Sequence, residues 1–256
     1  MTEAVADAST AAGGIAARLA QVRARIAAAE RAAGRDPGSV RLLLATKTQP
    51  AAHVRAALDA DRRALATHSD GHARPVLLGE NRVQELVAKA PELVDLDPEL
   101  HLIGPLQSNK VNAALRWASC VQSVDTLALA HRLGARRADE GRVLDVLVQV
   151  NVSGEPTKHG ATPGDAAALA LAVAQVAGLR LRGLMTVGAN ATDPDRVRGG
   201  YALLRRLLQD VVTSGGAGVR AADELSMGMS RDLELAIAEG ATIVRTGTAV
   251  FGDRPA

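Results

Sequence analysis

The sequence predicts an α/β protein built as a single (β/α)8 TIM barrel. Its length of 256 residues is typical of one such barrel, and no Pro/Ser/Gly-rich linker divides it. From Arg41 onward, short apolar runs alternate with helical patterns, which is typical of βαβ units and a parallel sheet. The eight apolar runs favour a closed barrel over an open doubly wound sheet.

The eight runs predicted as strands are short and rich in leucine and valine. They cover residues 41–46, 75–79, 100–104, 120–124, 143–152, 179–187, 224–227 and 242–246, and four of them end in threonine or glycine. Hydrophobic residues make up 47% of the chain but aromatic residues only 1%. The core must therefore be packed mainly from leucine, valine, isoleucine and alanine.

The two ends of the chain carry separate expectations. Residues 1–14 are small and acidic, which predicts a disordered tail and not a signal peptide, so that residues 15–256 form one domain. Further on, Ile15, Leu19, Val22 and Ile26 lie on one face of a helix. The chain stops at Ala256, soon after the eighth strand, so we expect no helix after that strand. We expect the N-terminal helix to cover the resulting gap.

Residues 59–75 show no clear periodicity and are predicted to form an extended surface loop. This loop contains His68 and His72 at a metal-compatible spacing. Other candidate ligands do not lie nearby, and the six histidines show no HxH or HExxH pattern, so we expect solvated loop histidines and no metal site.

Composition excludes several classes of function. The net charge is only +2 and the basic residues form no long run, so we expect no nucleic-acid binding despite a pI of about 9.0. The single cysteine, Cys120, excludes an intrachain disulfide and is typical of a reducing compartment, which predicts a cytoplasmic protein. No apolar run is long enough to span a membrane. GxGxxG, Walker and nucleophile-elbow motifs are also absent from the sequence.

The first strand ends in Lys47, a primary amine placed directly after a buried run. Active sites of TIM barrels lie at the carboxyl ends of the strands. Burial there would favour the neutral amine, the form that attacks an aldehyde to make a Schiff base. The alternative is a lysine that extends into solvent beyond the strand.

The ends of the last two strands predict a phosphate site. Arg245, Gly247 and Thr248 place a cation, a glycine and a hydroxyl where barrels commonly bind phosphate; the alternative is a tight turn capped by Thr248. Ser230 follows strand seven, before a helix expected near Arg231. It is a candidate N-cap, and a helix N-terminus also attracts phosphate.

Seven segments, spread in order from the first strand to the last, resemble the YggS/PROSC family of pyridoxal phosphate homeostasis proteins. They are ATKT at 45–48, GENRVQE at 79–85, HLIGPLQSNK at 101–110, SVD at 123–125, LRGLM at 181–185, LSMGMS at 225–230 and VRTGTAVFG at 244–252. The chain departs from the family pattern at Gln49, where many members carry a second lysine, and at Leu78, where phenylalanine is usual.

The resemblance implies a fold-type III barrel like the N-terminal domain of alanine racemase, with pyridoxal 5'-phosphate (PLP) as cofactor. Lys47 then holds PLP as a Schiff base, and the other cofactor-binding candidates are Asn81, Ser226, Ser230, Arg245, Gly247 and Thr248. The spacing from Arg245 to Gly247 matches that of alanine racemase. This predicts a guanidinium that faces the pyridine nitrogen and keeps the ring a weak electron sink, because arginine only donates hydrogen bonds. The alternative is an Arg245 that turns outward to pair with a helix carboxylate.

Two functions are compatible with this barrel. The first is binding, storage and delivery of PLP without turnover, by a cytoplasmic monomer that passes PLP to PLP-dependent apo-enzymes. The second is a fold-type III PLP enzyme such as an amino-acid racemase. We predict the first function and no catalytic residue. Alanine racemase adds a β-domain to its barrel and takes a second catalytic base from a partner subunit, whereas this sequence predicts a barrel alone. An RNA- or protein-interaction module is the third class, and only the pI supports it.

Overall fold

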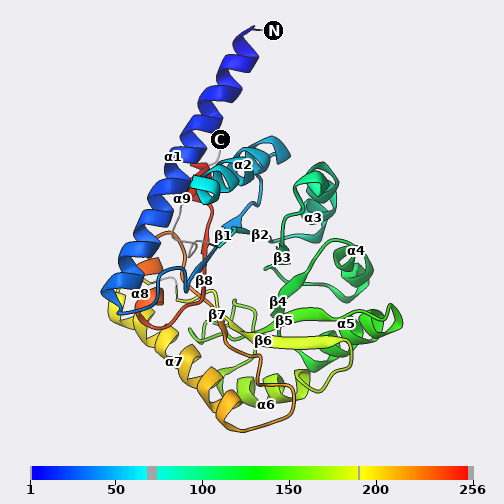
Figure 1. Ribbon diagram of the computed structural model, residues 1–256. Helices are drawn as coiled ribbons and strands as arrows, with labels where there is room; N and C mark the ends of the chain where they lie inside the picture. Colours follow the sequence, from blue (N-terminus) through cyan, green and yellow to red (C-terminus); the bar gives the residue numbers. More distant parts are fainter. Residues whose placement is uncertain (1, 68–73, 190, 253–256) are drawn as a thin grey trace.

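In the computed structural model, which describes residues 2–67, 74–189 and 191–252, eight parallel strands close into a barrel in sequence order (Figure 1). The strands are β1 (Arg41–Ala45), β2 (Leu77–Glu80), β3 (Leu100–Leu102), β4 (Cys120–Val124), β5 (Leu144–Gln149), β6 (Leu179–Met185), β7 (Glu224–Ser226) and β8 (Ile243–Thr246). Strand β8 pairs with β1 and closes the ring. The predicted strands and the TIM-barrel class are confirmed, although several strands end earlier than expected.

Helices surround the barrel (Figure 1). The α-helices are α1 (Thr2–Ala32), α2 (Ala51–Thr67), α3 (Val83–Lys89), α4 (Val111–Leu115), α5 (Leu127–Asp139), α6 (Pro163–Val173), α7 (Pro194–Thr213), α8 (Leu233–Ala238) and α9 (Thr248–Phe251). Short 3₁₀ turns are η1 (Ala90–Glu92), η2 (Val94–Leu96) and η3 (Ser108–Lys110).

Helix α1 lies against α2, α8 and α9 and covers the seam between β8 and β1, as expected (Figure 1). Its buried apolar side chains are Ile15, Leu19, Val22, Ile26 and Ala29. A disordered tail was expected over residues 1–14, but the helix begins at Thr2, so the described part of that segment has a helical backbone. Alanine is the best helix former and no proline interrupts the segment, so the helix continues toward the N-terminus.

Two further expectations about the helices are corrected by the structure. A four-residue helix, α9, follows β8 where none was expected, because one turn suffices to bury Val250 and Phe251. In addition, α2 extends to Thr67, so most of the predicted loop 59–75 is helical. The buried face of α2 includes Asp61, whose charge is paired with Arg23 of α1, and this buried carboxylate obscured the apolar periodicity. The candidates His68 and His72 lie outside the described residues.

The main core lies between the strands and the surrounding helices. Side chains alternate along each strand, so the opposite faces of the strands form separate, smaller clusters inside the barrel. One cluster contains Leu43, Leu77 and Ile243, and the other contains Cys120, Leu147 and Met185. Polar side chains from β3, β4, β7 and β8 are also buried in the barrel, and they bear on the site described next.

Candidate functional site

The first group at the mouth of the barrel is Lys47, which follows the end of β1. It lies in a turn closed by a hydrogen bond of 3.0 Å from the Gln49 amide to the Thr46 carbonyl oxygen. Lys47 is exposed, so the burial expected to favour its neutral amine is absent from the described structure. The reason is that β1 ends two residues earlier, at Ala45, so Lys47 lies in the turn beyond the strand.

The backbone on both sides of Lys47 is held by helix α3. The Thr48 amide donates to Glu85 Oε2 at 2.7 Å, and Lys89 Nζ donates to the Thr46 carbonyl oxygen at 2.6 Å. Thr48 has a φ of 62°, in the left-handed region that non-glycine residues rarely adopt. Glu85 and Lys89 therefore stabilise an unfavourable turn and fix the direction in which Lys47 leaves the backbone.

Lys89 belongs to a cluster of charges beneath this turn. Its ammonium lies 2.8 Å from Glu80 Oε1 and 3.3 Å from Glu85 Oε2, and the Thr46 hydroxyl donates to Glu80 Oε1 at 2.5 Å. Burial raises the pKa of Glu80, although hydrogen bonds from Lys89 and Thr46 oppose the shift. At Glu85 burial also acts to raise the pKa, but hydrogen bonds from Thr48 and Lys89 outweigh it and lower the pKa.

Arg245, the second cationic group at the mouth, points into the barrel and is only 6% exposed. Its Nη1 donates to the Ser226 hydroxyl at 2.7 Å and its Nη2 to the Thr186 carbonyl oxygen at 2.6 Å. Burial lowers the pKa of Arg245 to about 10, so the guanidinium is still charged at neutral pH. The inward orientation matches the expectation for this residue, whereas the position of its guanidinium against a cofactor ring remains a prediction.

The segment after β8 offers backbone donors. Gly247 sits between β8 and α9, and a Cβ at this position would lie 3.0 Å from the Ala45 carbonyl oxygen, so a side chain would crowd β1. Thr248 is exposed and begins α9, so the segment continues as a short helix. The alternative to a phosphate site had been a tight turn capped by Thr248. Amides in the first turn of a helix have no partner within it, so those of this turn point outward as hydrogen-bond donors.

The predicted role of Ser230 as an N-cap is wrong. Helix α8 begins at Leu233, with Asp232 in the N-cap position, and Asp232 Oδ1 accepts a hydrogen bond from the Met229 amide at 2.5 Å. The carboxylate thus reaches back over the turn and displaces the serine from that role. Ser230 is half-buried, and its carbonyl oxygen accepts from Arg25 Nη2 at 3.0 Å.

Asn81 follows β2 and lines a cleft of about 610 Å³ at the same end of the barrel. Arg82, Gln107 and Lys110 are also among its lining residues. The ends of β2 and β3 meet closely here, because a Cβ at Gly104 would lie 2.0 Å from the Asn81 carbonyl oxygen. Only glycine fits at position 104, which explains why that residue occurs in the segment.

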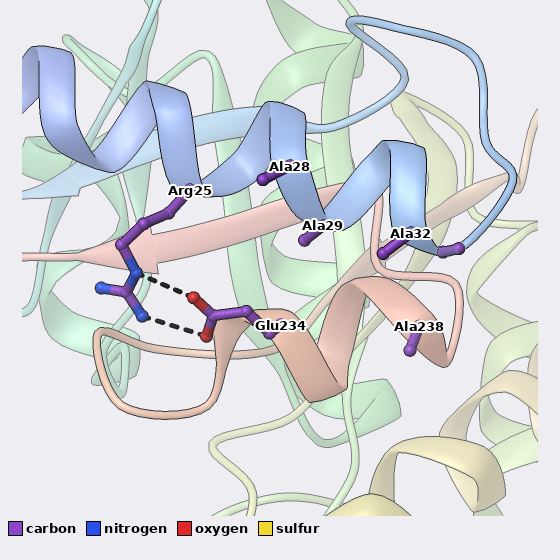
Figure 2. A pocket seen from close by; sticks show the side chains of 7 residues that line it. Arg25, Ala28, Ala29, Ala32, Glu234 and Ala238 are labelled. Atoms are coloured by element: carbon purple, nitrogen blue, oxygen red, sulfur yellow. Dashed lines mark hydrogen bonds and ion pairs between the residues drawn. The ribbon is translucent and has the colours of Figure 1, made fainter.

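A second hollow, of about 380 Å³, lies on the outer side of the barrel between α1 and α8 (Figure 2). It is lined by five alanines, and Figure 2 shows the ion pair of Arg25 with Glu234 at one end, 2.8 Å long. Alanine side chains supply neither a nucleophile nor a hydrogen-bond donor. The mouth of the barrel is therefore the candidate site.

Sequence reasoning missed the residues that support the two cations. Glu85 lies within a segment already singled out, but its bond to the Thr48 amide depends on a turn geometry that the sequence does not reveal. Gln122 was detectable as a polar residue inside a predicted strand, two positions after the inward-facing Cys120 and so on the same face.

Among the described residues, no group of three or more His, Cys, Asp or Glu could hold a metal ion. None of the described helices is long and apolar enough to cross a membrane.

Comparisons with known proteins agree on the relatives of this chain. The sequence model described as "Alanine racemase, N-terminal domain" matches residues 17–255. The pyridoxal phosphate homeostasis protein of Pseudomonas aeruginosa is 46% identical over 240 residues, covering 94% of this chain and 96% of that protein. The protein of the same name from Escherichia coli K12 is 40% identical over 245 residues, covering 94% and 97%.

Solved structures extend this comparison. PipY of Synechococcus elongatus PCC7942, determined with PLP bound, superposes with a TM-score of 0.74 at 34% identity, covering 93% of this chain and all of PipY. Alanine racemase from Corynebacterium glutamicum superposes at 0.65 with 18% identity, covering 95% of this chain and 62% of the racemase, and shows the common fold alone. This chain belongs to the family of pyridoxal phosphate homeostasis proteins, built on the alanine racemase N-terminal fold.

Proposed function

We propose that this chain binds PLP at the mouth of the barrel, with Lys47 as the covalent attachment point, and serves PLP homeostasis without turnover of its own. The observation that carries the proposal is the convergence of a primary amine, a guanidinium and a glycine turn at one end of the barrel. PLP bound in the PipY structure, and the names of the relatives, support it.

The groups present fit the three parts of PLP. The cofactor supplies an aldehyde that a primary amine can bond covalently, a ring nitrogen that accepts a hydrogen bond, and a phosphate. Exposed Lys47 presents its amine where an aldehyde can reach it. The phosphate would bind to the amides of Gly247 and Thr248, because glycine allows a close backbone approach. The Ser230 hydroxyl would be a further hydrogen-bond donor to it.

Arg245 and Asn81 complete the proposed site. Arg245 would donate to the ring nitrogen and so disfavour its protonation, which leaves the ring a poor electron sink. Racemisation, decarboxylation and transamination all require a stronger sink or a placed second base, so a protein that holds and releases PLP fits this geometry better than an enzyme. Asn81 would contact the ring from the end of β2.

Absorption spectroscopy and peptide mapping test the proposal together. The purified protein should be yellow, and borohydride reduction should fix the cofactor to the peptide containing Lys47. Lys47→Ala should abolish the visible band, and the control Lys110→Ala, at the edge of the same mouth, should keep it. A band of parent intensity in Lys47→Ala would overturn the assignment.

The same proposal covers delivery and context. We infer a cytoplasmic monomer that passes PLP to apo-enzymes; a buried lone cysteine, Cys120, is compatible with a reducing compartment. Loaded protein should restore the activity of a PLP-dependent apo-enzyme, and gel filtration should give the mass of one chain.

A separate experiment tests the enzyme alternative. Incubation with a panel of amino acids should produce no turnover, whereas racemised product would favour the enzyme alternative.

A further inference from the structure

A chain of hydrogen bonds crosses the barrel interior from Arg245. The Ser226 hydroxyl, which accepts from Arg245, donates to Gln122 Oε1 at 2.6 Å. Gln122 Nε2 lies 2.7 Å from His101 Nδ1, and His101 Nε2 lies 2.9 Å from Glu99 Oε1. The residues from Arg245 to His101 are at most 6% exposed, so water does not compete for these bonds. We call these five residues the polar chain.

The polar chain has a fixed direction. A guanidinium only donates hydrogen bonds, so the Ser226 oxygen must accept from Arg245 and its proton must go to Gln122. The amide nitrogen of Gln122 then faces His101 and donates to Nδ1. His101 Nδ1 therefore accepts from Gln122, and the Nε2–H of the ring is directed at Glu99.

Glu99 ends the polar chain as an ionised acceptor. Burial acts to raise its pKa, but hydrogen bonds from His101 and Arg41 outweigh it and lower the pKa to about 2. Arg41 Nη2 lies 2.5 Å from Glu99 Oε2, at the amino-terminal end of the barrel. A permanent acceptor at one end and a donor-only group at the other allow a single orientation of every group between them.

Reversal of the middle of the polar chain would break it. If the Gln122 amide turned over, its nitrogen would face the Ser226 oxygen and its oxygen would face His101 Nδ1. The Ser226 hydroxyl would then lose its acceptor while two donors pointed at its oxygen. A buried group left without a partner is costly, so the orientation of Gln122 determines that of Ser226, and through Ser226 that of Arg245.

We propose that His101 and Gln122 are positioning residues that hold the Arg245 guanidinium at the angle needed to meet the ring nitrogen of PLP. The inference rests on the proposed function, and it assigns the buried Ser226 to Arg245 in place of direct contact with the cofactor. Two Arg245 nitrogens are used by Ser226 and Thr186, and the remaining N–H groups of the fork are left for the ligand. Neither positioning residue touches PLP.

A pair of ligands isolates this effect. PLP and its analogue with C–H in place of the ring nitrogen share the aldehyde and the phosphate, so their affinity ratio reports only the contact at the nitrogen. The parent should prefer PLP about tenfold, the size expected for a hydrogen bond from a charged donor. Gln122→Met, similar in volume, should reduce the preference to below about threefold, because Arg245 loses its fixed support.

Two further variants keep the test interpretable. Ser226→Ala breaks the polar chain by loss of one oxygen and should have the same effect even where Gln122→Met folds poorly. Ser123→Ala removes a buried hydroxyl from the same strand, β4, that bonds to the Gly104 carbonyl outside the polar chain, and it should keep the parent preference. Parent-like preference in both Gln122→Met and Ser226→Ala would overturn the inference.

A measurement without cofactor separates this inference from the proposed function. Guanidinium N–H signals of Arg245 should exchange slowly with water in the parent, as observed by ¹⁵N NMR, and faster by tenfold or more in Gln122→Met. Unchanged exchange would contradict positioning whether or not PLP binds. If the parent does not bind PLP but Arg245 exchange is faster in Gln122→Met, the proposed function is contradicted. The support of Arg245 by the polar chain would then still hold.

Discussion

Lys47 and Arg245, the two cations of the proposed site, are held in different ways. Lys47 is exposed on a left-handed turn, and the ion cluster of Glu80, Glu85 and Lys89 fixes only the backbone on either side of it. Arg245 is buried, and its own guanidinium is bonded to Ser226 and Thr186. Lys47 therefore has a fixed backbone and a side chain that can move, whereas Arg245 has a fixed side chain.

This difference corresponds to different tasks. A group that forms and breaks a covalent bond must move and reach solvent, whereas a group that recognises one ring atom gains from a single orientation. Rotamer freedom in Lys47 is compatible with release of a bound aldehyde. A rigid Arg245 loses little conformational entropy when a ligand arrives.

The largest contrast should be in stability. Arg245→Ala leaves a cavity and deprives the buried Ser226 and Thr186 oxygens of a donor, so we expect a loss of about 3 kcal/mol in the free energy of unfolding. Lys47→Ala removes an exposed side chain and should change it by less than about 0.5 kcal/mol. Urea unfolding of both variants measures this, and equal losses would remove the distinction drawn between the two cations.

The backbone support of Lys47 can be tested through Glu85. Glu85→Ala should speed hydrogen exchange of the Thr48 amide and cost about 1 kcal/mol of stability, because one hydrogen bond in the turn is lost. The rate at which Lys47 reacts with pyridoxal should fall as the turn loses its fixed direction. Gln84→Ala, an exposed neighbour on the same helix, should leave both rates unchanged. Identical Thr48 exchange in Glu85→Ala and the parent would show that α3 does not hold the turn.

The smallest expected effect concerns acid stability at the far end of the polar chain. The pKa of Glu99 is lowered from 4.5 to about 2 in the folded state, so the unfolded state binds its proton first as pH falls. Stability from Glu99 is then present above pH 4.5 and lost as pH falls toward 2. Glu99→Gln should show a shallower loss of stability across this window in urea titrations. A slope identical to the parent's would show that Glu99 is not paired in solution.

The sequence predicted the barrel because the apolar runs of its strands are short and separated by helical patterns. It failed where a charge interrupts a buried face. Asp61 lies in the buried face of α2. Its ion pair with Arg23 of α1, a helix distant in sequence, offsets the free-energy cost of burying the carboxylate. Local periodicity cannot detect such a pair, because the partners are far apart in sequence.

The candidate site was predicted in part for a similar reason. Strand ends located Lys47 and Arg245, because topology alone brings those ends together. The exposure of Lys47 was the alternative that the sequence left open, since it depends on where β1 stops and on the left-handed turn at Thr48. The polar chain depends on which side chains meet across the barrel, and single-strand patterns contain no information on that.

The position of α1 has a consequence for the order of folding. Arg18 donates to the Val250 carbonyl oxygen at 2.7 Å and Arg25 to that of Ser230 at 3.0 Å, so the first helix docks on the last segments of the chain. Strands β1 and β8 likewise pair across nearly the whole sequence. Contacts of such long range form slowly, because the loop that they close is large. During synthesis α1 emerges long before α8 and α9, so the part of its apolar face that packs against these two helices lacks its partners until they are made.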